Sequence, residues 1–227
     1  HLTAGYSYWK TNDYRMQPEN GTLAMRVAAL PLLAMDLRWI TPDHPEWHTS
    51  IVNRVGYDFF FRLGNPLDRM LLAARGAIAL LGVFTLWLIW RWARGLFGVR
   101  AGGLALGLAV FCPALLAHGA LATSDMAITA AFLGALTVFW RLLHVVTWPR
   151  LALTSIAGGA VLLAKMSGVL IAPMLGALLV VRWARPAPLV WCLGRTPRWR
   201  RGRARVAAGT LGVTLLTGVA NLVVLWS

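Results

Sequence analysis

The sequence predicts an all-α, polytopic membrane protein, and three observations carry this prediction. Of the 227 residues, 58% are hydrophobic and 13% are charged, whereas soluble domains contain about 25% charged residues. The hydrophobic residues form long runs separated by short arginine-rich links. Seven of the eight acidic residues fall in the first 68 positions. The chain therefore divides into a polar segment, residues 1–69, and an apolar segment, residues 70–227.

The net charge of +14 does not indicate nucleic-acid binding, because a basic footprint needs a soluble face to present it. The arginines lie instead in links between apolar runs, where the positive-inside rule places them. Cys112 lies in an apolar run and Cys192 in a basic link, which does not suit a disulfide framework. Because the chain starts at His1 and ends as an apolar run ends, we expect it to be a piece of a longer protein.

Residues 1–69 are predicted to form an extracytoplasmic loop that carries interfacial amphipathic helices. In "LAMRVAALPLLAMDLRWI", residues 23–40, apolar residues recur at helical spacing, but Arg26 and Pro31 interrupt the run. Such a segment suits a helix on the membrane surface better than one that crosses it. "RVGYDFFFRLGNPLDRM", residues 54–70, resembles a second interfacial element because its aromatic side chains favour headgroup depth.

Residues 70–227 are predicted to form a bundle of about six transmembrane helices. Runs of about 20 apolar residues are long enough to cross the hydrocarbon core. Four runs meet this criterion, and the stretch 151–181 is too long for one span and short for two. The predicted spans are 70–90, 102–122, 126–146, 151–164, 168–181 and 206–226.

The arginine-rich links decide the number of crossings. Links 91–100, 141–150 and 182–205 are basic, and the last contains eight arginines, whereas 119–125 has no basic residue. If all three basic links are cytoplasmic, two short crossings must lie between residues 151 and 181, with a turn near Lys165. Residues 1–69, 118–125 and Lys165 are then all expected on the extracytoplasmic side.

Asp125 is the one acidic residue in the last 159 positions. In one interpretation it caps the helix that follows "TSD", since a short polar side chain is favourable there. In the other it belongs to a functional site, because ionisable residues at membrane depth are functional candidates. Its isolation in a basic region favours the second interpretation slightly.

Three basic residues lie near the same expected face: Arg75, His118 and Lys165. Arg75 and Lys165 can extend to lipid headgroups or hold a phosphate group. His118 can pack against the backbone or take part in a site. The "HPEWH" sequence, residues 44–48, is not a zinc-protease motif and its proline disfavours a regular helix, so we do not predict a metal site there.

Three segments together resemble a known family. "HLTAGYSYWKTNDYRMQPEN", "CPALLAHGALATSDMAITAAF" and "AGGAVLLAKMSGVLIAPM" are similar, in this order, to the first half of polytopic lipid-linked-sugar glycosyltransferases. These are the GT-C enzymes akin to protein O-mannosyltransferases and the bacterial aminoarabinose transferase. The resemblance covers nearly the whole chain and implies a multi-pass protein of the bacterial inner membrane.

The resemblance also implies roles for individual residues. Asp125 matches the acid after "HG…AT", Glu19 matches the glutamate of a "PE" segment, and Lys165 matches a lysine that ends the family's fifth helix. His1 matches a histidine that closely follows an acidic pair, so this pair is expected upstream and the chain alone is expected to be inactive. After Glu19 the chain reads "NGTL" where many relatives have "HPPL".

The chemistry that the resemblance implies is transfer of a sugar from a polyprenyl-phosphate donor to a protein, lipid or glycan hydroxyl group. A carboxylate would act as general base, with inversion at the anomeric carbon. If the base lies within the chain, the candidates are Asp13, Glu19 and Asp125. Arg75, Lys165 and His118, or a divalent metal, would stabilise the departing phosphate. The alternatives are a transporter or lipid flippase, or a non-catalytic membrane assembly subunit.

Overall fold

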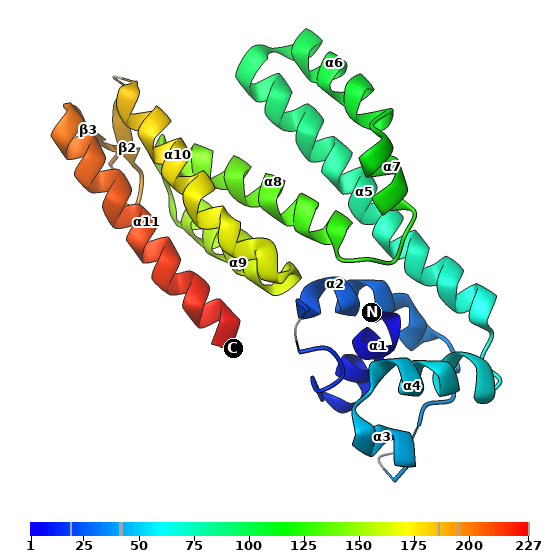
Figure 1. Ribbon diagram of the computed structural model, residues 1–227. Coiled ribbons are helices and arrows are strands. Elements are labelled where there is room, and N and C mark those ends of the chain that lie inside the picture. The colour runs from blue at the N-terminus through cyan, green and yellow to red at the C-terminus, as the bar shows by residue number, and fades with distance from the viewer. Residues whose placement is uncertain (19, 41–42, 186, 195, 227) are drawn as a thin grey trace. The chain divides into compact units, whose positions relative to one another are not determined.

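The structure is a computed structural model that describes residues 1–18, 20–40, 43–185, 187–194 and 196–226. Most of these residues are helical, which confirms the predicted all-α class (Figure 1). The chain divides into two compact units. The first comprises His1–Ala130 together with Ala164–Met166, and the second comprises the rest of the chain.

The polar segment folds into short helices. They are α1 (Leu2–Thr11), α2 (Thr22–Ala29), the 3-10 helix η1 (Leu30–Ala34), α3 (Pro45–Thr49), α4 (Val52–Tyr57) and the π-helix η2 (Asp58–Arg62). The sequence predicted helical structure over residues 23–40 and 54–70 but did not predict α1. Pro31 accounts for the break in the first predicted helix, because α2 changes to η1 beside it.

Residues 2–8 of helix α1 are all buried, and the helix crosses α2 closely. A Cβ atom added to Gly5 would lie 2.0 Å from the Met25 carbonyl oxygen, so the two backbones meet at this glycine. Tyr6 and Tyr8 are almost fully buried beside it. The helix was not predicted because its apolar face is built from tyrosines and small residues, which give a weak hydrophobic pattern.

The polar segment packs onto the first half of α5 (Leu67–Phe97). One core cluster joins Leu2 and Tyr6 of α1 to Met70 and Ile78 of α5, and it also contains Met126. A second cluster holds α1, α2, α3 and α4 together and includes Tyr8, Met25, Trp47 and Val55. The start of α8 therefore shares its core with the start of the chain.

Helix α5 is followed by a bent helix pair. Gly98, with φ of 92°, ends α5 and allows α6 (Val99–Val110) to return along it. Gly102 faces Arg94 at the crossing, where a Cβ would lie 2.8 Å from the arginine Cβ. The predicted span 102–122 is broken, because α7 (Pro113–Gly119) bends from α6 by 63°. Pro113 explains the break, since proline removes a helical hydrogen bond.

The second unit contains most of α8 (Asp125–Leu142), together with α9 (Trp148–Ala164), α10 (Ile171–Ala184) and α11 (Arg203–Trp226). The 3-10 helix η3 (Met166–Leu170) joins α9 to α10. A Cβ on Gly168 would lie 2.4 Å from the Val161 carbonyl oxygen, so glycine lets the chain turn tightly against α9. The turn lies at "AKMSG", as the sequence predicted.

A small sheet that the sequence did not predict lies in the basic links. Strand β1 (Val145–Val146) pairs in parallel with β2 (Leu189–Trp191), which pairs antiparallel with β3 (Arg198–Arg200). Leu189 is fully buried in a cluster with Leu142, Val206 and Val213. The sheet thus ties the link after α8 to the link before α11.

Among the described residues, four helical segments are long and apolar enough to cross a membrane, and the bent pair α6–α7 makes up to five. Helix α9 is apolar but has only 17 residues. Most residues of each predicted span are helical, although the span 126–146 ends in β1 and the span 102–122 is broken, so the multi-pass character is supported. The count of six stays a prediction, because α9 is shorter than the candidate spans and α6 and α7 reach sufficient length only if the bent pair is taken as one span.

Candidate functional site

The candidate site is centred on Asp125, the first residue of α8. Its Oδ1 atom accepts a hydrogen bond of 2.7 Å from Lys165 Nζ, and its Oδ2 atom lies 3.5 Å from His118 Nδ1. We call these three residues the Asp125 cluster. All three belong to the first compact unit. His118 belongs to α7 and Asp125 to α8, whereas Lys165 lies between α9 and η3, 40 residues from Asp125 in the chain.

The surroundings of each residue explain how the Asp125 cluster forms. Lys165 directly follows the last residue of α9, at the turn that Gly168 closes. His118 lies in the last turn of α7, next to Gly119. A Cβ on Gly119 would lie 3.6 Å from the Met126 methyl carbon, so α7 packs beside the start of α8. Backbone turns at small residues therefore bring the three side chains together.

The contacts of Asp125 bear on the two interpretations of this residue. A capping side chain accepts hydrogen bonds from backbone N–H groups of its own helix. Within the described residues, the Asp125 carboxylate instead contacts the side chains of Lys165 and His118. A carboxylate at the start of α8 is also favourable for the helix dipole. Capping of α8 alone therefore does not explain why the Asp125 carboxylate contacts Lys165 and His118.

The Asp125 cluster is accessible to a ligand. The side chains of Asp125, Lys165 and His118 are 36%, 35% and 46% exposed. An ammonium group has three donors, and one hydrogen bond to Asp125 is described for Lys165. Lys165 can therefore keep its carboxylate contact and still donate to the oxygens of a phosphate group. An exposed ion pair contributes little to the stability of the fold. Its relevance to ligand binding is that it holds the Lys165 ammonium group in place.

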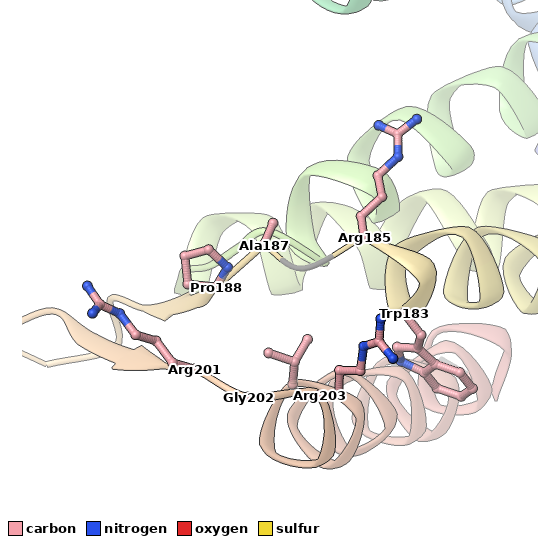
Figure 2. Close-up of a pocket in the computed structure, with 8 residues that line it drawn as sticks. Trp183, Arg185, Ala187, Pro188, Arg201, Gly202 and Arg203 are labelled. Atoms are coloured by element: carbon pink, nitrogen blue, oxygen red, sulfur yellow. The ribbon is translucent and has the colours of Figure 1, made fainter.

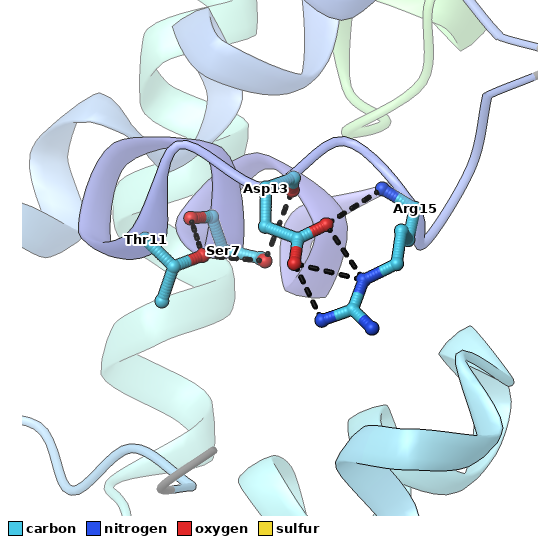
Figure 3. Close-up of polar contacts among 4 residues, drawn as sticks. All are labelled: Ser7, Thr11, Asp13 and Arg15. Carbon is cyan, nitrogen blue, oxygen red and sulfur yellow. Dashed lines mark hydrogen bonds and ion pairs between the residues drawn. The ribbon is translucent and has the colours of Figure 1, made fainter.

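Asp13, a second predicted acid, is held by a neighbouring arginine (Figure 3). Arg15 Nε lies 3.0 and 2.8 Å from the two Asp13 oxygens, and the Arg15 backbone N–H donates to Oδ1 at 3.0 Å. The hydrogen bonds from Arg15 lower the pKa of Asp13. A carboxylate with a lowered pKa is a weak proton acceptor, so these contacts suit a structural turn better than a general base.

The other predicted site residues lie apart from the Asp125 cluster in the contacts described. Arg75 is exposed on α5 and makes no ion pair with any described residue. His1 Nδ1 lies 3.1 Å from Gln17 Oε1, so the start of the chain contacts the loop that leads to the "PE" segment. Glu19 lies outside the described residues.

The sequence did not identify a buried carboxylate in the polar segment. Asp58 is 4% exposed in the π-helix η2 and lies 3.6 Å from His44 Nε2 and 3.2 Å from Arg62 Nη1. The other His44 nitrogen, Nδ1, accepts a hydrogen bond from the Glu46 backbone N–H. The sequence signal that could have indicated burial of Asp58 is the run of aromatic residues that follows it. No group of three potential metal ligands occurs in the part of the chain that the structure describes.

One comparison with known proteins finds a match to a protein family. The sequence model of a family described as dolichyl-phosphate-mannose-protein mannosyltransferase matches residues 53–194, which is more than half of the chain. The matched region includes all three residues of the Asp125 cluster. No curated protein and no solved structure matches the chain.

Proposed function

Because the chain belongs to the dolichyl-phosphate-mannose-protein mannosyltransferase family, we propose that it transfers a sugar from a polyprenyl-phosphate donor to a hydroxyl group of a protein, lipid or glycan. Its membership makes it a glycosyltransferase, and its long apolar helices make it an integral multi-pass membrane protein. We further propose that the reaction takes place on the extracytoplasmic face of a bacterial inner membrane.

The observation that carries this proposal is the ion pair between Lys165 and Asp125. A polyprenyl-phosphate sugar presents its phosphate group at the membrane surface, and both residues lie at the ends of apolar helices. The pair is partly exposed, and Lys165 retains donors for phosphate oxygens. A cation at this position can bind a donor that the membrane delivers.

The transfer requires one bond to form and one to break. The acceptor oxygen attacks the anomeric carbon, its proton passes to a carboxylate, and the sugar–phosphate bond breaks with its electrons on the phosphate oxygen. Attack from the face opposite the leaving group inverts the anomeric configuration. Since the leaving phosphate gains negative charge, cations that contact it lower the barrier.

In this scheme Asp125 orients Lys165, and Lys165 stabilises the leaving phosphate, with His118 as a second donor. A fixed carboxylate limits the positions that a flexible lysine can adopt. Asp125 is then a positioning residue, and the general base comes from another acid. Glu19 or the acidic pair expected upstream of His1 are the candidates for that base. A divalent metal stays a prediction, and no step above depends on it.

The experiment that tests this function uses the full-length protein in proteoliposomes. Polyprenyl-phosphate mannose labelled in the sugar is supplied, and release of polyprenyl phosphate and formation of labelled product are measured. We expect turnover with this donor, none with GDP-mannose, and an inverted anomeric centre in the product. Turnover with GDP-mannose would contradict the assignment of the donor class, and a retained configuration would contradict the single displacement.

A further inference from the structure

A basic pocket lies in the second unit, where α10 ends and α11 begins (Figure 2). Its cavity is about 420 Å³, and its walls are formed by α10, the link to β2 and the start of α11. Both helices are candidate membrane spans. Because both helices are candidate spans, we expect their adjacent ends, and with them the pocket, to lie at the depth of the lipid headgroups. The described lining residues are Trp183, Arg185, Ala187, Pro188, Arg201, Gly202, Arg203 and Val206.

The charge of this pocket is positive and is not neutralised by the unit around it. Three arginines, Arg185, Arg201 and Arg203, contribute to its wall. The chain has no acidic residue after Asp125, so the second unit contains no carboxylate side chain. All three arginines are exposed, and neither the Arg201 nor the Arg203 side chain has a hydrogen bond or ion pair among the described contacts.

Two nearby arginines differ because they hold the fold together. Arg182 is fully buried and donates hydrogen bonds to the carbonyl oxygens of Leu143, Ala187 and Pro188 at 2.9, 2.9 and 3.1 Å. Arg150 donates to the carbonyl oxygen of Val145 at 2.9 Å. These hydrogen bonds give Arg150 and Arg182 a structural role in the fold. Among the pocket arginines, Arg185 lies over the Trp140 ring, 6.0 Å from its centroid, whereas no side-chain contact is described for Arg201 or Arg203.

The remaining features of the pocket suit a headgroup. Trp183 is fixed by a hydrogen bond of 2.9 Å from its Nε1 atom to Thr210 Oγ1, which connects α10 to α11. Tryptophan favours the membrane interface. In Figure 2, Arg203 extends towards Trp183, whereas Arg185 and Arg201 extend outward on either side. The first N–H groups of α11, a helix of 24 residues, add further positive potential.

We propose that this pocket binds the phosphate group of an anionic phospholipid. A guanidinium group matches phosphate geometry and charge, and basic clusters next to a membrane span attract anionic lipids. This site is separate in its residues from the Asp125 cluster and does not depend on the proposed transfer reaction. A free phosphate ion would share the chemistry at the arginines but would not use the adjacent membrane surface.

The test measures lipid binding to the full chain in detergent micelles. Fluorescent dioleoylphosphatidylglycerol is titrated, with unlabelled dioleoylphosphatidylglycerol, dioleoylphosphatidylcholine and inorganic phosphate as competitors. We expect the fluorescent lipid to bind saturably. Phosphatidylglycerol should displace it, phosphatidylcholine should displace it at least about tenfold more weakly, and millimolar inorganic phosphate should not displace it. Displacement by inorganic phosphate at the concentration that suffices for phosphatidylglycerol would overturn the assignment to a lipid.

Matched variants separate the pocket from general surface charge. Arg185→Gln combined with Arg203→Gln should weaken phosphatidylglycerol binding by about tenfold or more, because each cation near an anionic surface contributes several-fold. Arg91→Gln combined with Arg100→Gln removes the same charge from another basic link and should change binding less than about twofold. The variant Arg185→Lys with Arg203→Lys should retain most binding. Equal weakening by both glutamine variants, or none by the first, would refute the site.

Discussion

At the scale of single residues, the Asp125 cluster makes a kinetic prediction. Asp125→Asn keeps the size and the capping ability of the side chain but removes the charge that holds Lys165 at 2.7 Å. If Asp125 positions Lys165, the turnover of the full-length enzyme should fall at least about tenfold, which corresponds to about 1.4 kcal/mol of transition-state stabilisation. Steady-state assays with polyprenyl-phosphate mannose measure this loss.

The partner residue extends this prediction to a double-mutant cycle. Lys165→Met should lower turnover by about a hundredfold, the usual effect of losing one donor to a developing oxyanion, and the double variant should lose little more. The matched control is the ion pair of Glu46 with Arg54, whose charges lie 3.7 Å apart on the polar segment. Glu46→Gln and Arg54→Met should leave turnover within about twofold. Additive losses at Asp125 and Lys165 would show that the two residues act independently.

A second residue, Asp58, is predicted to stabilise the fold of the polar segment. Its carboxylate is buried and contacts His44 and Arg62. Asp58→Asn removes the charge while both partners remain, so we expect a loss of about 1–3 kcal/mol in the free energy of unfolding. Thermal unfolding in detergent measures this effect. Asp36→Asn, at an exposed position, is the control and should shift the midpoint by no more than the error of the measurement.

At the scale of elements, the crossing of α1 and α2 depends on a glycine. Gly5→Ala would place a Cβ atom 2.0 Å from the Met25 carbonyl oxygen, so the helices must separate and the protein should lose about 2 kcal/mol or more. Gly76→Ala, in α5 with nothing within 4 Å of its Cβ position, should be neutral or stabilising by up to about 1 kcal/mol. Comparison of unfolding midpoints for the two variants tests the crossing, which equal effects would contradict.

At the scale of the whole molecule, the topology makes a labelling prediction. In a background that lacks Cys112 and Cys192, Leu121→Cys and Thr196→Cys each introduce one thiol at an exposed position. The link 119–125 is expected outside and the link 182–205 inside, so an impermeant reagent should label intact cells only at position 121. Labelling of both positions from outside would require a different number of crossings.

The sequence by itself determined the membrane class and most of the helix positions. Apolar runs of sufficient length specify membrane helices because unpaired backbone groups are too costly in lipid. Pro31 and Gly168 act locally, at places where the sequence predicted an interruption or a turn, whereas the break at Pro113 was missed because 102–122 was predicted as one span. The order of three short motifs also identified the family that the match over residues 53–194 established.

Only the tertiary structure decided which charged residues share a site. Asp125 and Lys165 are 40 positions apart, and a hydropathy pattern does not specify which side chains meet after a helix returns. The same is true of α1, whose crossing depends on the backbone approach at Gly5, and of Arg182, whose carbonyl partners lie in two separate links. The lipid environment favours apolar residues position by position, so local sequence patterns report it. A site depends instead on contacts between segments that are distant in the sequence.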